Sequence, residues 1–272
     1  MFCDEPSVKV SVLMGVHNIA GLRLFDRAVG SVLAQTMDDF EFLICDDGST
    51  DRTWALLERI AKQDARVRLL RNTKNEGLAF TLNRCLQAAQ GEYVARQDAD
   101  DISAPERFAV QLAFLEQHPE IAFLGSDVIL WDECGAWGKR EFPEYPQVRD
   151  FLFTMPFVHG ALMFRREAVR KAGGYRVARE TRRAEDYDLL MRMYAQGQNG
   201  ANISRPLYAF REDSAARKRR KYCYRIDEAV VRWRGFRSLG LLPGAFPYVV
   251  KPLLVGLLPQ QILQRAKKGR KF

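Results

Sequence analysis

The sequence lacks the features that mark several classes of protein. Its five cysteines form no Cys-x-x-Cys pair, and with only three histidines they show no spacing typical of a zinc site. We therefore expect reduced thiols in a cytosolic setting. The opening stretch MFCDEPSVKV has no basic flank followed by an apolar run, so we expect no signal peptide.

Acidic residues are scarce in the C-terminal region. From Ser214 onward there are 15 of the 42 Lys and Arg residues but only two of the 34 acids. This tail therefore carries a formal charge of +13 and the preceding body −5. A basic tail on an acidic body indicates an anionic partner for the tail, such as lipid head groups, nucleic acid or an acidic protein.

The body has the pattern of an α/β protein. Apolar residues make up 47% of the chain and charged residues 28%, as in folded domains. Short apolar runs alternate with helical patterns, which is typical of βα units on a mostly parallel sheet. The pattern predicts strands at 8–16, 40–45, 67–70, 92–96 and 121–130, and helices near 22–33, 53–60, 78–89 and 106–117.

Two acidic loops follow strands of this predicted sheet. DDGSTD (46–51) follows the second strand, and QDADD (97–101) follows the fourth. Carboxyl ends of parallel strands share one edge, where open α/β sheets bind ligands. Asp98, Asp100 and Asp101 would repel one another, and a bound Mg²⁺ or Mn²⁺ would remove that repulsion. The alternative for these acids is a solvated turn.

Seven segments together resemble one known family. These segments are VSVLMGVHN, SVLAQT, DDGSTD, NEGLAFTLN, GEYVARQDADD, HGALMFRREAVRKAGGY and AEDYDLLMRM. With them the chain resembles family 2 glycosyltransferases with the GT-A fold, a Rossmann-like three-layer α/β/α architecture. The resemblance spans about residues 8–212 in the expected order.

The resemblance implies a nucleotide-sugar donor held by a divalent cation. Asp98, Asp100 and Asp101 match the family's metal-binding acids, with Asp100 as the main ligand and Mn²⁺ or Mg²⁺ as the cofactor. The residues that match the family's donor site are Val16, Asn18, Asp46, Asp47, Asn75, Gly77, Leu78, Asp98 and Ala99. Alternatively, Asp46 and Asp47 cap the next helix, and Asn75 and Gly77 form a turn. Val16-His17-Asn18 departs from the family's aromatic-Asn pair.

The second half of the match implies the catalytic residues. Asp186 matches the family's base, which takes the proton from the attacking acceptor hydroxyl, and Glu185 would orient it. Attack opposite the leaving group inverts the anomeric centre. The alternative is that both acids only favour the helix N-terminus, where the dipole stabilises negative charge. His159 matches the acceptor or metal region, or is a structural histidine.

We expect a catalytic domain at 1–213, with a nucleotide-binding half (1–101) and an acceptor half (102–213). The QxxRW segment of processive synthases is absent, which favours transfer of a single sugar. We expect a UDP-sugar donor and a saccharide or lipid-linked acceptor in cell-envelope polysaccharide or lipopolysaccharide synthesis. Two other hypotheses are a non-catalytic nucleotide-sugar-binding protein and a nucleotidyltransferase, although the latter's glycine-rich basic loop is missing.

The tail (214–272) is predicted to be helical, basic and amphipathic. RKRRKYCYR precedes an apolar stretch that prolines and Lys251 interrupt, and its longest uncharged runs are 13 residues. A spanning helix needs about 20 apolar residues, so we expect the tail to lie in the interface of an anionic membrane. This predicts a peripheral protein on the inner face of the cytoplasmic membrane. Nucleic-acid binding, which we do not expect, and a helical cap over the domain are the alternatives.

Overall fold

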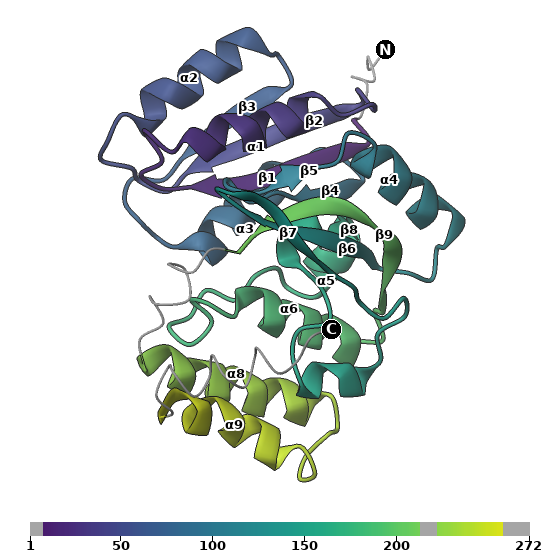
Figure 1. Ribbon diagram of the computed structural model, residues 1–272. Coiled ribbons are helices and arrows are strands. Elements are labelled where there is room, and N and C mark those ends of the chain that lie inside the picture. The colour runs from purple at the N-terminus through teal and green to yellow at the C-terminus, as the bar shows by residue number, and fades with distance from the viewer. Residues whose placement is uncertain (1–7, 213–221, 258–272) are drawn as a thin grey trace, which may run out of the picture.

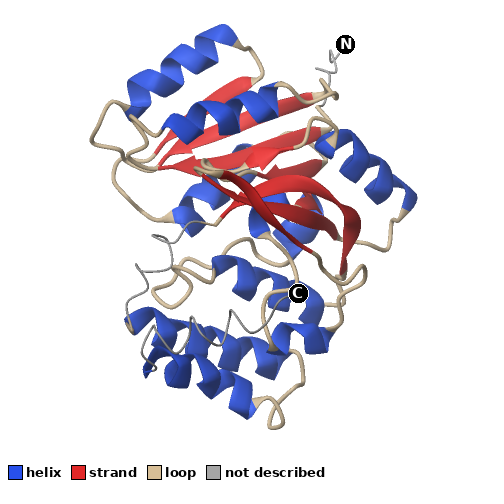
Figure 2. Ribbon diagram, viewed as in Figure 1, coloured by secondary structure: helices blue, strands red, loops and turns tan. Residues whose placement is uncertain are grey.

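The computed structural model describes residues 8–212 and 222–257 (Figure 1). A nine-stranded sheet forms the centre, with strand order β3-β2-β1-β4-β8-β6-β9-β5 and β7 paired to β6. Helices lie against both faces of the sheet, and the C-terminal helices form a layer of their own at the far side of α6 (Figure 2). The expected α/β architecture with added C-terminal helices is confirmed.

The first half is a regular parallel unit. Its strands follow one another through helices and pair in parallel in the order β3-β2-β1-β4. Their bounds are within two residues of the predicted ones, because alternating apolar runs and helical spacing are local signals. The elements are β1 Val10–Val16, α1 Arg23–Leu33, β2 Phe40–Asp46, α2 Thr53–Gln63, β3 Val67–Arg71, α3 Leu78–Ala88 and β4 Tyr93–Arg96.

The second half is mixed rather than parallel. β8 runs antiparallel to both of its neighbours, β4 and β6. β5 pairs antiparallel with β9, and β7 pairs antiparallel with β6. The parallel pair in this half is β6 with β9. The elements are β5 Ile102–Ser103, α4 Arg107–Gln117, β6 Phe123–Asp132, β7 Gly135–Arg140, β8 Met163–Arg165, α5 Arg166–Lys171, α6 Glu185–Ala195 and β9 Gly200–Arg211, with 3-10 turns at Val148–Leu152 and His159–Ala161.

The central parallel strands of the sheet are buried on both faces. All of β2 is buried, and so is β1 apart from Gly15, as expected for parallel strands covered by helices. Alternate side chains of a strand point to opposite faces, so Val12 and Leu13 belong to two different apolar clusters. The sheet is therefore a rigid platform, and its edge can hold loops in fixed positions.

The described part of the tail is two helices that pack on the domain. α8 (Cys223–Ser238) and α9 (Phe246–Leu257) form a hairpin, and α8 lies against α6 (Figure 1). Phe236 and Val249 are buried in the same cluster as Met191 of α6. A Cβ on Gly235 would lie 2.2 Å from the Met191 sulfur, so only glycine allows this close approach. Residues 222–257 therefore cover the domain as a helical cap.

Within residues 8–212 and 222–257, no helix is long and apolar enough to cross a membrane. The basic stretches 217–221 and 265–271, on which the tail hypothesis partly depends, lie outside the described residues.

Candidate active site

Three loops meet at the carboxyl edge of the parallel strands. The backbone of Asp47 donates a 2.8 Å hydrogen bond to the Val16 carbonyl, and that of Gln97 donates a 3.1 Å bond to the Leu13 carbonyl. These bonds extend the ladders of β1 with β2 and with β4 beyond the strand ends. The loops after β1, β2 and β4 are thus fixed next to one another, as the sequence predicted.

A small pocket lies between the loop after β1 and the start of α3. Its volume is about 200 Å³. Five of the predicted donor-site residues line it, together with Gly15, His17 and Thr81: they are Val16, Asp47, Asn75, Gly77 and Leu78. The structure therefore brings together side chains that are up to 62 positions apart in sequence.

Asp47 organises the wall of this pocket. Its carboxylate is buried and accepts three hydrogen bonds, from the Asn72 side chain (2.7 Å) and from the backbone N–H groups of Glu76 and Gly77 (2.9 Å each). Gly77 has a φ of 90°, a conformation that favours glycine. A buried carboxylate with three donors holds the 75–78 loop in one conformation.

Two of the predicted donor-site residues brace the loops rather than line the pocket. Asp46 is fully buried; it accepts the backbone N–H of Ser49 (3.0 Å) and pairs with Arg71 (3.2 Å). Asn18 adopts a φ of 51° and exchanges hydrogen bonds with Ser49 and Thr50, each 2.9 Å long. Both side chains tie the DDGSTD loop in place. Asp46 bonds Ser49, four positions before α2 begins, so it stabilises this loop instead of capping the helix.

The two acids of the DxD pattern, Asp98 and Asp100, each face an arginine. Asp98 accepts a 2.5 Å bond from the buried Arg96, and its backbone N–H donates to the Tyr208 hydroxyl (3.1 Å). Asp100 lies 3.4 Å from Arg211 at the end of β9. Asp100, Ala99 and Arg211 line a second cavity of about 880 Å³ beside the start of α1.

Asp101 lies under the loop instead of in the site. Its side chain is 1% exposed, and one oxygen accepts the Arg211 backbone N–H at 2.6 Å. Burial, together with the charges of Asp98 and Asp100, raises the pKa of Asp101 well above its usual range. Its geometry does not support the prediction that Asp101 binds the metal; it joins the DxD loop to β9.

Asp98 and Asp100 fit a divalent cation with few protein ligands. Their side chains keep 32% and 44% of their surface exposed, and carboxylate oxygens are the donors that Mg²⁺ and Mn²⁺ prefer. Within the described ranges, no cluster of three or more His, Cys, Asp or Glu residues could hold a metal. A cation here would therefore take its remaining ligands from phosphates and water.

Two buried arginines, Arg96 and Arg107, support the acidic loop. The sequence analysis predicted a role for neither. Arg107 donates to the backbone carbonyl of Arg96 (2.9 Å) and to the side chains of Gln97 (3.2 Å) and Ser103 (2.9 Å). Burial lowers the pKa of Arg107 to about 10. A basic residue inside the apolar strand EYVAR, two positions before Asp98, is the local signal that indicates the Arg96–Asp98 pair.

Glu185 and Asp186 begin α6 next to the same loop. Burial and the neighbouring Asp186 raise the pKa of Glu185 to about 8, and burial raises the pKa of Asp186 to about 6. The charges of Asp98 and Arg96 also act on both pKa values, in opposite directions, so these four groups share one electrostatic environment. The predicted base and Asp98 thus lie close enough for their charges to interact.

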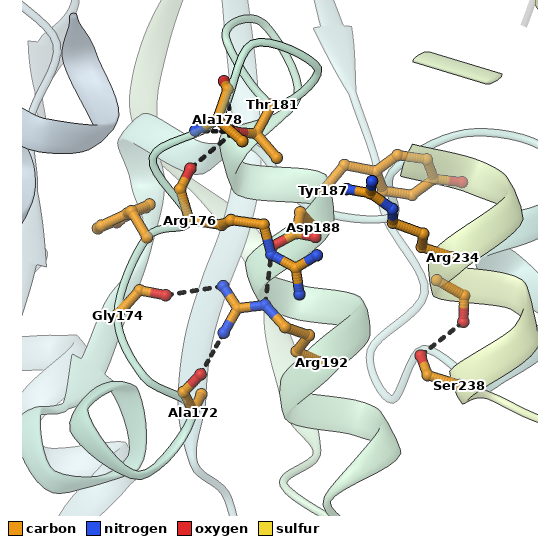
Figure 3. A network of polar contacts seen from close by, with 12 residues as sticks. Ala172, Gly174, Arg176, Ala178, Thr181, Tyr187, Asp188, Arg192, Arg234 and Ser238 are labelled. Carbon is orange, nitrogen blue, oxygen red and sulfur yellow. Dashed lines mark hydrogen bonds and ion pairs between the residues drawn. The ribbon is translucent and has the colours of Figure 1, made fainter. Parts of the chain in front are cut away.

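A polar network fixes the loop that leads into α6 (Figure 3). Arg192 of α6 pairs with Asp188 at 2.7 Å and donates to the carbonyls of Ala172 and Gly174. The Thr181 hydroxyl donates to the Arg176 carbonyl at 2.6 Å. Figure 3 shows these contacts within the 172–181 loop and between that loop and α6, so they fix the loop on the helix that begins with Glu185 and Asp186.

His159 lies beside the site and is not presented to solvent. It is 8% exposed, and its Nε2 shares a 2.8 Å hydrogen bond with the Tyr175 hydroxyl. Burial and the charge of Arg96 lower the pKa of His159 well below its usual value, so the ring is neutral. A Cβ on the next residue, Gly160, would lie 2.9 Å from the Asp98 carboxylate. A role for His159 toward the acceptor remains a prediction.

Solved structures of low sequence identity share this fold. A structure of S. aureus TarS 1-349 in complex with UDP-GlcNAc aligns with a TM-score of 0.70 at 17% sequence identity. The alignment covers 89% of this chain and 73% of the TarS chain. The mannosyltransferase PcManGT from Pyrobaculum calidifontis, in complex with GDP-Man and Mn²⁺, gives 0.61 at 21% identity, covering 96% of this chain and 79% of its own. Both likenesses concern the fold alone.

Curated relatives match the chain over almost its whole length. The putative glycosyltransferase EpsE of Bacillus subtilis (strain 168) is 41% identical over 267 residues, which cover 96% of this chain and 94% of the relative. The amylovoran biosynthesis glycosyltransferase AmsE of Erwinia amylovora is 29% identical over 93% and 96%. The model of glycosyl transferase family 2 matches residues 11–173. This chain therefore belongs to glycosyl transferase family 2.

Proposed function

We propose that the protein transfers one sugar from a UDP-sugar to a hydroxyl of a saccharide or lipid-linked saccharide, with inversion at the anomeric carbon. The observation that carries this proposal is the convergence of three groups: the pocket at Asp47, the exposed carboxylates of Asp98 and Asp100, and the acids Glu185 and Asp186. Donor, metal and base sites next to one another are what such a transfer requires.

The pocket of about 200 Å³ is where we place the nucleobase of the donor. Asp47 shapes its wall, and the loop at 75–78 closes it. The TarS structure, which contains UDP-GlcNAc, supports uridine as the base; the GDP-Man in PcManGT makes guanosine the competing choice.

Asp98 and Asp100 would hold a Mn²⁺ or Mg²⁺ ion against the donor diphosphate. When bound, the cation would neutralise the negative charge that develops on the departing nucleoside diphosphate. Arg96 fixes the orientation of Asp98 through their 2.5 Å bond. Arg211 adds positive charge to the same cavity, beside Asp100.

Asp186 would accept the proton of the acceptor hydroxyl as that oxygen attacks the anomeric carbon. A pKa near 6 leaves Asp186 mostly ionised at neutral pH and a better base than an ordinary aspartate. Glu185, whose pKa is raised to about 8, stays mostly protonated beside it. Attack from the side opposite the diphosphate would convert an α-linked donor into a β-linked product.

The biological role that we propose is cell-envelope polysaccharide synthesis. Its support is the full-length similarity to AmsE, whose name refers to amylovoran biosynthesis, together with the GT2 family match.

Release of the nucleoside diphosphate tests the proposal. The purified protein is incubated with Mn²⁺ and, in turn, UDP-glucose, UDP-galactose, UDP-GlcNAc and GDP-mannose, with and without acceptor saccharides. We expect UDP release from one UDP-sugar, and its loss in Asp186→Asn. Binding of a UDP-sugar without release from any donor and acceptor pair, in both proteins, would instead support a non-catalytic binding protein.

A further inference from the structure

The C-terminal helix hairpin has one face that the fold does not use. Its inner face is packed on α6: Val231, Phe236 and Val249 are at most 7% exposed. Its outer face carries large apolar side chains that are 44–70% exposed, which are Tyr222, Ile226, Trp233, Phe246, Leu254 and Leu257. Exposed apolar side chains that gather in one patch mark an interaction surface.

The six side chains, which we call the hairpin patch, form one continuous face. Tyr222, Ile226 and Trp233 are spaced by four and seven residues, and so fall on one stripe of α8. The α9 members, which begin at Phe246, follow an i, i+8, i+11 spacing that has the same effect. The Trp233 and Phe246 rings contact edge to face at 6.3 Å, so the two stripes meet.

The hairpin patch has positive charge around it. Arg237 and Lys251 are exposed, and both acids of the tail, Asp227 and Glu228, lie in α8, where Glu228 pairs with Arg225 and Arg232. Five consecutive basic residues, 217–221, immediately precede α8, and five more occur between 265 and 271. Among the described residues, the face is therefore apolar, with the exposed Arg237 and Lys251 beside it.

The two described ends of the hairpin lie together. The first residue of the described tail, Tyr222, and Gly256 near the end of α9 lie together, because a Cβ on Gly256 would be 3.0 Å from the Tyr222 ring. The chain therefore enters and leaves the hairpin at one point. In the sequence, five basic residues come before the hairpin and five come after it.

We propose that the hairpin patch is a membrane-binding surface that lies flat on a bilayer of anionic lipids. Apolar side chains with basic neighbours are the combination that interfacial helices use, because the first enter the acyl boundary and the second attract anionic head groups. A second copy of the chain is disfavoured as the occupant, since two faces of the same sign would repel. The reaction would then take place on the inner face of the cytoplasmic membrane.

The position of the hairpin patch has a consequence for the acceptor. α8 packs directly on α6, which begins with Glu185 and Asp186. Binding through the opposite side of α8 would hold the base one helix layer away from the lipid surface. A lipid-linked saccharide could then reach it, and this last step rests on the proposed function.

Vesicle co-sedimentation of the full chain tests the surface. We expect the protein to pellet with vesicles of phosphatidylcholine and phosphatidylglycerol, and to bind phosphatidylcholine alone much more weakly, because basic residues are attracted to anionic head groups. Leu254→Ser and Trp233→Ser should each weaken binding by about tenfold, since each removes a large apolar group from the interface. Trp137→Ser, which alters an equally exposed tryptophan on β7, is the matched control and should bind as wild type does.

Three results would overturn the proposal. The first is equal pelleting of Leu254→Ser, Trp233→Ser and wild type. The second is binding that is the same with and without phosphatidylglycerol. The third is a dimer, seen by light scattering, that Leu254→Ser converts to a monomer while vesicle binding is absent. Thermal stabilisation by UDP, measured on the same variants, is expected to be unchanged, so failure here is distinguishable from failure of the proposed function.

Discussion

The wall of the small pocket and the start of α6 each hold a buried acid, and the two carboxylates differ in how they are hydrogen-bonded. Asp47, in the pocket wall, is buried with three hydrogen-bond donors around its carboxylate. Glu185, at the start of α6, is also buried, but its Oε2 has no hydrogen-bond partner among the described residues, and its pKa is raised to about 8. The Asp47 carboxylate therefore has hydrogen-bond donors that compensate for its burial, whereas burial of the Glu185 carboxylate disfavours its charged form.

This difference separates a structural carboxylate from a reactive one. A fully bonded acid such as Asp47 is fixed before any ligand arrives, as suits a pocket that recognises a base by shape. Acids whose charge is poorly compensated, such as Glu185 and Asp186, hold or release protons in the physiological range, as suits acid–base chemistry. The donor side of the site is therefore preorganised, and the acceptor side is chemically poised.

Asp186→Asn is the change with the largest expected effect. Loss of the base should lower kcat by about 10²- to 10⁴-fold and leave UDP binding unaltered, because the pocket belongs to the other half. Steady-state rates and UDP titrations on the same preparation measure both. Asp26→Asn, an exposed acid in the first turn of α1, is the control. A rate near wild type in Asp186→Asn would place the base elsewhere.

Asp47→Ala should affect folding and binding together. Removal of the carboxylate leaves the Asn72 amide and two backbone N–H groups without their acceptor, so we expect a loss of about 3 kcal/mol in the free energy of unfolding, and weaker UDP binding. Asp51→Ala, which removes an exposed carboxylate that accepts the backbone N–H groups of Thr53, at the start of α2, and of Ala20, should cost about 1 kcal/mol. Urea unfolding of both variants checks this order, and equal losses would contradict the structural role of Asp47.

Glu185→Gln should change the pH dependence of stability. The pKa of Glu185 is about 8 in the folded protein, above its ordinary value of 4.5, so the folded state binds the extra proton. The stability that depends on Glu185 being protonated is fully present below pH 4.5 and is lost as the pH rises toward 8. Between pH 5 and pH 8.5, the free energy of unfolding of the variant should rise relative to that of wild type by on the order of 2 kcal/mol, as measured by urea unfolding. A constant difference across pH would contradict the raised pKa.

Asp101→Asn is the change with the smallest expected effect. Burial raises the pKa of Asp101, which disfavours its charged form, and an amide oxygen can still accept the Arg211 backbone N–H. The free energy of unfolding at pH 7 should stay within about 1 kcal/mol of wild type, and metal-dependent UDP binding should persist. If UDP binding were lost as in a variant of Asp100, Asp101 would have to be counted with the metal-binding acids.

The same contrast explains what the sequence could reveal. Strand bounds in the first half were predicted to within two residues, and five predicted donor-site residues share a pocket, because strand ends and loops there follow one another along the chain. In the second half, Arg211 meets Asp101 across 110 positions, and β4 pairs with β8 across about 70. Such contacts have no local signal, so the inward turn of Asp101 and the partner of Asp100 were not foreseen.

Calorimetric titration of UDP, with Mn²⁺ and with EDTA, tests the central claim most directly. We predict binding that depends on Mn²⁺ in wild type and in Asp101→Asn, and that in Asp100→Ala is weakened by at least the 10- to 100-fold typical of disturbed metal sites. UDP binding that is equally strong in EDTA and in Asp100→Ala would contradict the assignment of Asp98 and Asp100 as the acids that hold a metal against the donor diphosphate.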